Sequence, residues 1–410
     1  MLIDFEVKNF RSFKNSTLFT LETGARLRKY NETHSLKAND VQLLKSAVVF
    51  GANAHGKSNL FKALGELVLL VGFPTKMSTD KLYTDTFAGN NENTYFKVNF
   101  IKNNQKFSYT IEYNAKAVVF EQLIVDDVVI LERETQSFKV IPAQIKDLKD
   151  NIRENQLFLY FAQLNNVKIA TTAVEWLLND LIFVSSGTLD SQNNWLIDQL
   201  KNDTFKTRFL LFLKAADFNI VDIEVIDTRT HISQANLSIV DGKVSGNFDE
   251  KRVMNVQKLI TTHSFENGEL YKTELSNESQ GTQAFLTIAL YILFAQEKGN
   301  KVIFIDEFTN SFHLELAQAI LDLIHSENQK NQFILTTHEL SLMDYELRAD
   351  QIYFAQKDRN GATDIFSLFD FDDKGLKRND FGYKKRYLNG MYGAKSAISS
   401  TLLKGYLEEL

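Results

Sequence analysis

The chain of 410 residues contains no cysteine and only two prolines. The absence of cysteine excludes a disulfide framework, a thiol nucleophile and every metal centre built on thiolate ligands. The longest apolar run, residues 67–73, is far shorter than the ~20 residues that span a membrane. Residues 1–8 alternate apolar and charged side chains, which predicts a half-buried strand and not a signal peptide. We therefore expect a cytoplasmic protein with no membrane partner.

The chain also lacks a strong charge of either sign. Its 46 basic and 52 acidic side chains give a net charge of −6, so any contact with nucleic acid would need a local basic patch. Hydrophobic residues make up 44% of the chain, which is enough to build a folded core. A length of 410 residues predicts two or three domains.

Apolar strands alternate with helical patterns near both ends of the chain, which favours an α/β domain with a mostly parallel sheet. We expect residues 1–93 and 261–410 to form this domain, with residues 94–260 inserted between its halves. The expected strands and helices of the C-terminal half are strands 302–305, 333–335 and 352–354 and helices 280–296 and 314–325. The insertion is expected to hold a β-meander over 94–134 and helices over 145–213. Strands are expected over 220–274, with turns at Asp241-Gly242 and Asn267-Gly268.

Residues 51–58 fit the pattern G-x-x-x-x-G-K-[ST], between an apolar strand and a helical pattern. Glycines let the backbone N–H groups of such a loop wrap a phosphate, and the helix adds the positive end of its dipole. We expect Lys57 to reach the β- and γ-phosphates and the Ser58 hydroxyl to bind Mg²⁺. The alternative is a chance glycine-rich turn. The predicted site consists of Gly51, Ala52, Asn53, Ala54, His55, Gly56, Lys57, Ser58 and Asn59.

Two acids, Asp306 and Glu307, directly follow the apolar run 302–305. A buried parallel strand delivers the residues at its carboxyl end to the ligand edge of a sheet. We expect Asp306 to bind Mg²⁺, directly or through water, and Glu307 to orient or deprotonate an attacking water. Adjacent acids that merely solvate the end of a strand are the alternative.

A further apolar strand, residues 333–335, ends in Thr336, Thr337 and His338. Carboxyl ends of parallel strands meet at one edge of a sheet, so this end is expected to face the same ligand. A histidine there can donate a hydrogen bond to the γ-phosphate. Taken alone, a histidine after a strand is more often merely a polar cap.

The polar stretch Ser279, Gln280, Gly281 and Thr282 opens an apolar helix, with Ser279 placed as its N-cap. An exposed helix N-terminus with serine and glycine is an anion site, and the loop at 51–58 already supplies one. We therefore expect this second site to bind the γ-phosphate held by another copy of the chain. An ordinary capped helix is the alternative.

With these motifs in this order, the chain resembles ABC-type ATPases, specifically the AAA-type ATP-binding proteins of the OLD and abortive-infection group, related in their heads to Rad50 and SMC proteins. Residues 51–58 correspond to that group's Walker A motif and Ser279–Thr282 to its signature. Asp306-Glu307 corresponds to Walker B with the catalytic glutamate, and His338 to the switch histidine. Weaker correspondences are Asn9–Phe13 (opening loop), Ser311–His313 (D-loop), and Asp350–Phe354 and Tyr387–Ala394 (C-terminal elements).

The resemblance implies an α/β fold, namely an ABC-type P-loop ATPase head built from both chain ends with an inserted β-meander and helical arm. It implies an ATPase in which two heads sandwich two ATP molecules with Mg²⁺, with Glu307, His338 and Lys57 as catalytic residues. It also implies a role in antiphage defence. No segment after Phe354 resembles the TOPRIM nuclease of OLD proteins, so the nuclease-like or toxin effector would be separately encoded.

Two other functions stay open. A DNA repair or end-processing ATPase of Rad50 or SMC type is one, although an insertion without sustained heptads predicts no long coiled coil. A nucleotide-gated scaffold that does not hydrolyse ATP is the other.

Two basic segments are candidates for contacts with nucleic acid. The first is residues 26–29, and the second spans 377–387. For the second segment a solvated loop at a partner interface is the favoured interpretation, and the first segment is the weaker candidate. The second segment contains Lys377, Arg378, Lys384, Lys385 and Arg386, interleaved with Phe381, Tyr383 and Tyr387.

Overall fold

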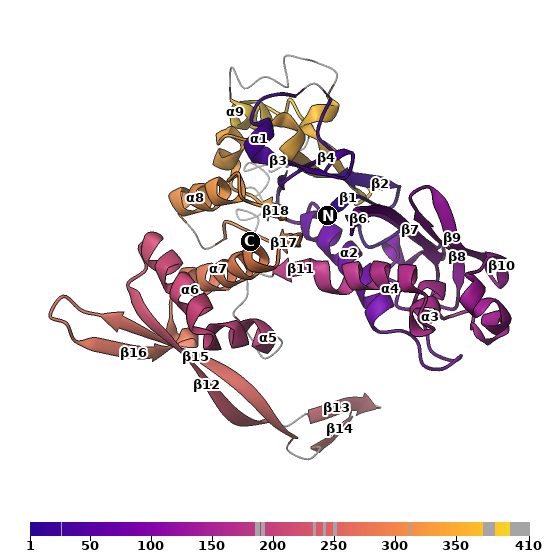
Figure 1. Ribbon diagram of the computed structural model, residues 1–410, viewed down its shortest axis with the longest axis horizontal. Coiled ribbons are helices and arrows are strands. Elements are labelled where there is room, and N and C mark those ends of the chain that lie inside the picture. The colour runs from indigo at the N-terminus through magenta and orange to yellow at the C-terminus, as the bar shows by residue number, and fades with distance from the viewer. Residues whose placement is uncertain are drawn as a thin grey trace, which may run out of the picture. The chain divides into compact units, whose positions relative to one another are not determined.

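The computed structural model places the chain in two compact units (Figure 1). The first unit joins Met1–Ser185 to Gly299–Leu410, and the second is Ser186–Lys298. The described residues are 1–25, 27–184, 189, 193–232, 235–240, 243–248, 252–310, 313–371 and 382–393, with side chains described outside 229–255.

A six-stranded sheet lies at the centre of the first unit, and five of its strands run parallel. Strands β5, β17 and β18 are buried at every position, as expected for a parallel sheet covered on both faces. Both halves of the chain contribute strands, as the sequence predicts. In spatial order the strands are β11 (Leu181–Val184), β17 (Val302–Ile305), β18 (Gln332–Thr337), β5 (Ser46–Phe50), β19 (Ile352–Lys357) and the antiparallel β20 (Thr363–Ser367).

The predicted strands of the C-terminal half are confirmed, because 302–305, 333–335 and 352–354 lie in β17, β18 and β19. The helical prediction for 145–213 is wrong at β11, which pairs in parallel with β17. A four-residue apolar run cannot be assigned to a strand or a buried helix by periodicity alone. Hydrogen bonds to a strand more than a hundred residues away decide its conformation.

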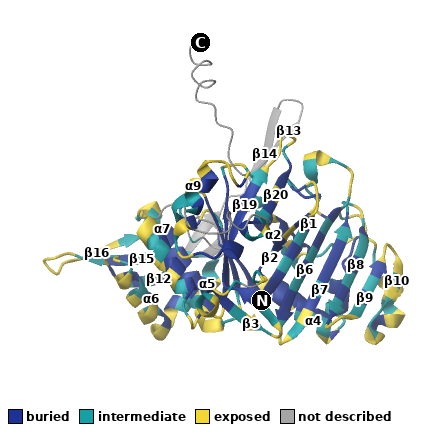
Figure 2. Ribbon diagram, turned by 90° about the horizontal axis from the view of Figure 1, so that it is seen from above, coloured by how far each residue is buried: buried dark blue, intermediate teal, exposed yellow. Residues whose placement is uncertain are grey.

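A seven-stranded antiparallel sheet completes the first unit. Along its strands, buried positions alternate with partly exposed ones, visible as dark and light bands in Figure 2. Such alternation is typical of a sheet with one face on the core. The strands in spatial order are β10 (Ser137–Val140), β9 (Val128–Glu134), β8 (Val118–Val125), β7 (Gln105–Tyr113), β6 (Thr94–Lys102), β1 (Leu2–Lys8) and β2 (Thr17–Thr20).

The predicted boundary at residue 94 does not coincide with the boundary between the units. Strand β6 pairs with β1, from Leu2 opposite Phe100 to Lys8 opposite Tyr95, so the meander extends a sheet that the N-terminus begins. The separate unit begins only after β11 and continues to Lys298. The separate unit therefore also contains the helix Gln280–Lys298, which the predicted boundary at residue 261 assigns to the other domain.

A buried carboxylate also joins the meander to the helices that follow it. Glu121 is fully buried and accepts hydrogen bonds from Tyr109 Oη (2.9 Å) and Arg133 Nε (3.1 Å). It also accepts from the N–H groups of Phe158 and Leu159, both at 2.7 Å, at the start of α3. The other helices of this unit are α1 (Asn31–His34), α2 (Lys57–Gly72), α4 (Lys168–Glu175), α8 (Leu314–Ile324) and α9 (Tyr383–Leu388), beside α3 (Phe158–Leu164) and the hairpin β3 (Ser35–Ala38) and β4 (Val41–Leu44).

The second unit combines a three-stranded sheet with helices. The predicted turn at Asn267-Gly268 is confirmed, since it joins β15 to β16 with Gly268 at a φ of 81°. The turn predicted at Asp241-Gly242 lies outside the described residues. The elements are α5 (Asn194–Ile197), α6 (Asp203–Ala215), β12 (Ile220–Ile232), β13 (Ala235–Val240), β14 (Lys243–Phe248), β15 (Arg252–Ser264), β16 (Leu270–Glu274) and α7 (Gln280–Lys298).

Candidate nucleotide site

The loop between β5 and α2 requires glycine at both ends. Gly56 has a φ of +91°, and a Cβ there would lie 2.2 Å from the Thr363 hydroxyl. A Cβ on Gly51 would lie 2.7 Å from the carbonyl oxygen of Ala355. Side chains are therefore excluded at both positions, and the backbone enters the sixteen-residue helix α2 directly. The loop lies at the carboxyl edge of the parallel sheet, as predicted.

Lys57 is the first residue of α2 and lies over this loop. Its ammonium group donates hydrogen bonds to the carbonyl oxygens of Gly51 (2.7 Å) and Ala52 (3.1 Å). Only 9% of the residue is exposed, and this burial lowers its pKa, although the charges of Asp306 and Glu307 oppose the shift. The positive charge is thus held between the loop and the two acids.

Asp306 receives two hydroxyl groups from different elements. Ser58 Oγ donates to one carboxylate oxygen of Asp306 at 3.0 Å, and Thr336 Oγ1 donates to the same oxygen at 2.5 Å. The fold therefore brings the predicted metal residues Ser58 and Asp306 together across 248 positions of sequence. A serine hydroxyl and a carboxylate are hard oxygen ligands of the kind Mg²⁺ prefers, so these residues fit that ion.

Glu307 adopts a backbone conformation that is rare for its residue type, with a φ of +52°. Its N–H donates to Thr336 Oγ1 at 2.8 Å, and its exposed carboxylate accepts from Asn310 Nδ2 at 3.1 Å. Thr336 thus accepts from the backbone of one acid and donates to the side chain of the other. Backbone outliers fixed in this way often occur at functional sites.

His338 follows β18 and is exposed at the same edge of the sheet. The preceding Thr337 is fixed by Thr309, whose hydroxyl lies 2.6 Å from its own, and accepts from the N–H of Glu339 at 2.9 Å. The turn that carries His338 is therefore held at the carboxyl edge, where the sequence predicts it.

The other loop residues differ in their surroundings. His55 has a buried Nδ1 without a hydrogen bond to the described residues, and burial lowers the pKa of its ring, although a backbone hydrogen bond to Ala355 opposes the shift. Ala54 has a φ of +64°, and Asn53 is exposed. Asn59 donates from Nδ2 to Ser12 Oγ at 2.7 Å.

Two residues beside the loop, Ser12 and Thr363, were not predicted as part of the site. Thr363 donates from its hydroxyl to the carbonyl oxygen of His55 (3.1 Å), and its N–H donates to the carbonyl oxygen of Ser12 (2.7 Å). Both are single hydroxyl residues in unremarkable sequence. For Ser12 the opening segment Asn9–Phe13 gives a weak signal, and for Thr363 the sequence gives none.

The predicted signature lies in the second unit. Ser279 caps α7, because its Oγ accepts from the N–H of Thr282 at 3.2 Å and lies 2.8 Å from the Thr282 hydroxyl. Ser279 and Gln280 are exposed, and Gly281 and Thr282 are partly exposed. The helix that they open has 19 residues. The signature and the phosphate loop thus belong to different units.

The basic segment near the C-terminus differs from its prediction. Arg386 is 8% exposed, and Tyr383 and Tyr387 are buried, with the Tyr387 ring 5.6 Å from that of Phe354. These rings pack against the protein and are not available to stack on bases. Lys384 binds Ser341 Oγ at 2.8 Å. Lys377, Arg378, Phe381, Arg26, Ser311, Phe312 and Ala394 lie outside the described residues.

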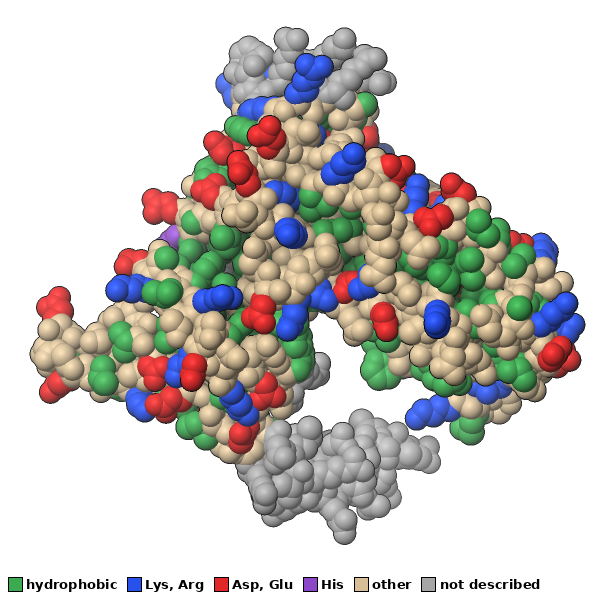
Figure 3. All heavy atoms as spheres, in the orientation of Figure 1, with side chains coloured by type: hydrophobic (Ala, Val, Ile, Leu, Met, Phe, Trp, Pro, Cys, Tyr) green, Lys and Arg blue, Asp and Glu red, His purple; other side chains and the backbone are tan. Residues whose placement is uncertain are grey.

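Acidic and basic side chains of the described residues are interspersed over the face drawn in Figure 3. In the part of the chain that the structure describes, no helix is both long and apolar enough to cross a bilayer.

The parallel sheet, the glycine-bounded loop and the hydroxyl–carboxylate contacts are those of an α/β P-loop nucleotide-binding domain, as the sequence predicts. The chain belongs to the family described as "AAA domain, putative AbiEii toxin, Type IV TA system", whose model matches residues 46–344. No curated protein matches the chain.

Solved structures of low identity were also found. The SMC head domain from Thermotoga maritima is 14% identical, with a TM-score of 0.42, and the match covers 89% of this chain and 98% of that one. An Smc head domain with an extended coiled coil, bound to the C-terminal domain of ScpA derived from Pyrococcus furiosus, is 12% identical, with a TM-score of 0.43 and coverage of 96% and 99%.

Proposed function

We propose that the chain hydrolyses ATP to ADP and phosphate, and that two copies close around two ATP molecules. The observation that carries the proposal is the convergence of the Ser58 and Thr336 hydroxyl groups on one carboxylate oxygen of Asp306, beside the phosphate loop. A P-loop protein that only bound nucleotide would not need Glu307 fixed next to this cluster.

The chain's own groups account for binding and proton transfer. Backbone N–H groups of residues 51–56 and the N-terminus of α2 bind the phosphates, with Lys57 as their counter-charge. Glu307 takes the proton of the attacking water, and His338 donates a hydrogen bond to the γ-phosphate. Mg²⁺, bound through Ser58 and Asp306, would neutralise charge on the phosphates.

The second copy supplies the signature. Ser279 and Gln280 present an exposed helix N-terminus, while each chain already has one phosphate loop of its own. An anion site of this kind is satisfied by the γ-phosphate bound to the other copy. ATP then favours the closed pair, because only that state contacts nucleotide from both sides.

Steady-state ATP hydrolysis and solution mass test this proposal on the native chain, Lys57→Ala and Glu307→Gln. We expect both variants to lose turnover and Glu307→Gln to accumulate an ATP-bound pair. ATP binding in a fixed assembly without turnover would instead establish the scaffold function. The absence of any nucleotide binding would refute the proposal as a whole.

Mixing two inactive variants tests the shared site. Lys57→Ala keeps an intact signature, and Ser279→Arg keeps an intact phosphate loop. A mixed pair has one complete site, so part of the native activity should return on mixing. If each site were completed within one chain, mixing would restore nothing.

We also propose that the ATPase controls a separately encoded nuclease-like or toxin effector in cytoplasmic antiphage defence. The family description, which names a type IV toxin–antitoxin system, supports this role. Phage challenge of cells carrying the gene with its neighbours should show protection that Lys57→Ala abolishes. Stimulation of the purified ATPase by DNA ends, without such protection, would favour the DNA-repair alternative.

A further inference from the structure

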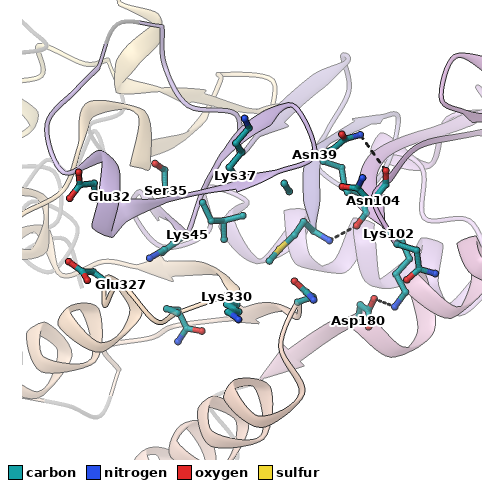
Figure 4. A pocket seen from close by; sticks show the side chains of 17 residues that line it. Glu32, Ser35, Lys37, Asn39, Lys45, Lys102, Asn104, Asp180, Glu327 and Lys330 are labelled. Carbon is teal, nitrogen blue, oxygen red and sulfur yellow. Dashed lines mark hydrogen bonds and ion pairs between the residues drawn. The ribbon is translucent and has the colours of Figure 1, made fainter.

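Two cavities of the first unit differ in how their charged groups are paired. One has a volume of about 570 Å³ and lies at the amino edge of the parallel sheet, where Lys45 precedes β5 and Asp180 precedes β11 (Figure 4). Lys102 is paired there with Asp180 at 2.5 Å, and Figure 4 shows the Lys45 ammonium group pointing toward Glu327. The charges of this cavity offset one another, so it favours no charged ligand.

The other cavity has a volume of about 460 Å³ and is lined by residues of α2, β11 and β17. Its volume is within the range of roughly 300–1,000 Å³ that small-molecule sites occupy. Three aromatic rings form part of the wall. The ring of Phe304 stacks on that of Phe183, with centroids 4.9 Å apart, and meets the edge of the Phe61 ring at 5.1 Å. Phe183 is the least buried of the three, so its ring is the one that a ligand can contact most fully.

The cavity is open along one side of α2. Gly65 lines it, and a Cβ added to Gly65 would have no atom within 4 Å. Leu69, one turn further along the helix, also lines the cavity and is half exposed. A small molecule can therefore enter beside this turn of α2.

Glu66 supplies a buried carboxyl group to the same cavity. The residue is 7% exposed, and no group of the described residues donates a hydrogen bond to its carboxyl oxygens. Burial raises the pKa of Glu66 to about 7, although the charge of Arg11 opposes the shift, and Asp85 adds to it. A carboxylate buried without a partner is costly, so a ligand that donates hydrogen bonds to it is favoured.

The other charged groups of the lining are already compensated. Arg11 is paired with Asp85 at 3.1 Å, and Asp306 accepts hydrogen bonds from two hydroxyl groups. Lys62 is exposed, so water screens its charge. Among the described residues of the lining, Glu66 is therefore the buried charged group that still needs a partner.

We propose that this cavity binds a small aromatic amine, with its ring against Phe183 and its ammonium group bound to the carboxylate of Glu66. Hydrogen bonds between an ammonium group and a carboxylate are roughly twice as strong as those between neutral groups. Aromatic rings also gain from offset or edge-to-face contacts with phenylalanine. An amine of this kind satisfies both the apolar wall and the unpaired acid.

The bound amine would lie beside the nucleotide site. Ser58 and Asp306, which fit Mg²⁺, also line the cavity. Ser58 and Glu66 both belong to α2, roughly 12 Å apart along its axis, so the two groups are bound by different ligands.

Calorimetric titration of the full chain, without nucleotide or metal ions, tests the proposal independently of ATP hydrolysis. The probes share an indole ring and differ in one group. Tryptamine carries an ammonium group, tryptophol a hydroxyl group and indole-3-acetate a carboxylate. We expect tryptamine to bind one site per chain, about tenfold more tightly than tryptophol, and indole-3-acetate to bind least. Equal affinities for tryptamine and tryptophol, or no binding of tryptamine, would overturn the proposal.

Two substitutions in α2 locate the site. Glu66→Gln keeps the shape of the side chain and should weaken tryptamine binding about tenfold while leaving the affinity for tryptophol unchanged. Gly65→Leu places a side chain in the open space and should abolish binding of both probes, so it decides the question even if Glu66→Gln fails to fold. Glu175→Gln, at an exposed glutamate of α4 outside the cavity, is the control. Native affinity for tryptamine in Glu66→Gln or Gly65→Leu, or an equal loss in the control, would contradict the assignment.

Discussion

At the carboxyl edge of the parallel sheet, polar side chains follow their strands directly and satisfy one another, whereas at the amino edge Lys45, His34 and His325 are buried with neutral hydrogen-bond partners. Asp306 receives two hydroxyl groups within 3.0 Å, and both come from adjoining elements. On the opposite edge, Lys45 binds a carbonyl oxygen and His34 stacks on His325 with ring centres 3.7 Å apart.

The polar network at the carboxyl edge is fully connected, and such a network holds its side chains in one geometry. Buried ionisable groups with few counter-charges instead respond to protons and to anions. We therefore expect substitutions at the carboxyl edge to change ATP turnover. At the amino edge we expect pH and anions to change the stability of the fold.

The largest effect is expected from Glu307→Gln at the carboxyl edge. Loss of the general base should lower ATP turnover by roughly 10²–10⁴-fold while nucleotide binding persists. Turnover and binding of a fluorescent ATP analogue measure the two effects separately. Glu315→Gln, an exposed glutamate at the start of α8, is the control and should keep native turnover. Equal losses in both variants would contradict the role of Glu307.

Acid should destabilise the amino edge. Burial lowers the pKa of His34 to about 4 and that of His325 well below its ordinary value. Gln351 Nε2 donates to His325 Nε2 (3.2 Å), so that nitrogen is unprotonated. Lys45 and Arg348 also oppose the charging of His34, whereas Asp350 favours it.

The unfolded chain binds protons on histidine near pH 6.5, before the folded chain does. Stability from His34 is therefore complete above that pH and is lost as pH falls toward 4, by about 3 kcal/mol in full. Burial raises the pKa values of Asp4 and Glu66 to about 6 and about 7, and these groups titrate in the opposite sense. The informative quantity is thus the loss of unfolding free energy on acidification, compared between the native protein and a variant without His34.

Urea unfolding at pH 7.5 and pH 5 measures this difference for native protein and His34→Gln. The variant should lose less stability on acidification than the native chain does. His263→Gln is the control, because His263 is paired with Glu278 at 2.7 Å in the second unit. An unchanged pH dependence in His34→Gln would show that the stacked pair does not resist protonation.

Thr336→Val tests the connected network with a smaller expected effect. The change removes the hydroxyl that donates to Asp306 and accepts from the N–H of Glu307. Loss of such a supporting contact should lower the affinity for Mg²⁺ roughly 10–100-fold. Titration of the metal in the hydrolysis assay measures this affinity. Thr172→Val removes a hydroxyl on α4 that donates only to the carbonyl oxygen of Lys168 and is the control. Equal effects of the two substitutions would contradict the role of Thr336.

The smallest effect is expected from Gly65→Ala, and Gly56→Ala in the same segment is its contrast. Gly65 lies within α2 with no atom within 4 Å of an added Cβ, so Gly65→Ala should raise stability by about 0.5–1 kcal/mol. Gly56→Ala should instead weaken nucleotide binding, because its φ of +91° and the nearby Thr363 exclude a side chain. Thermal unfolding and ATP affinity measure both changes, and an unaffected affinity in Gly56→Ala would contradict the account of the loop.

Much of the candidate site follows from sequence because its chemistry is contiguous there. Residues 51–58, Asp306-Glu307 and His338 each stand directly after an apolar strand, and parallel strands present such residues at one edge. Thr363 could not be predicted as part of the site, because a lone threonine reaches His55 only through the pairing of distant strands. The cavity at the amino edge of the sheet could not be predicted either, because its lining residues Glu32, Lys45, Asp180 and Lys330 form no motif in the sequence.

The apolar runs of the sequence predict strands β5, β17, β18 and β19, the polar residues that end them, and the phosphate loop that opens α2. Three features appear only in the folded chain: β11 is a strand, β6 extends the sheet begun by β1, and the parallel order is β11, β17, β18, β5, β19. The parallel strands are apolar on both faces, so their local patterns do not distinguish one neighbour from another. Their order depends on how the whole chain buries its apolar surface and satisfies its backbone hydrogen bonds.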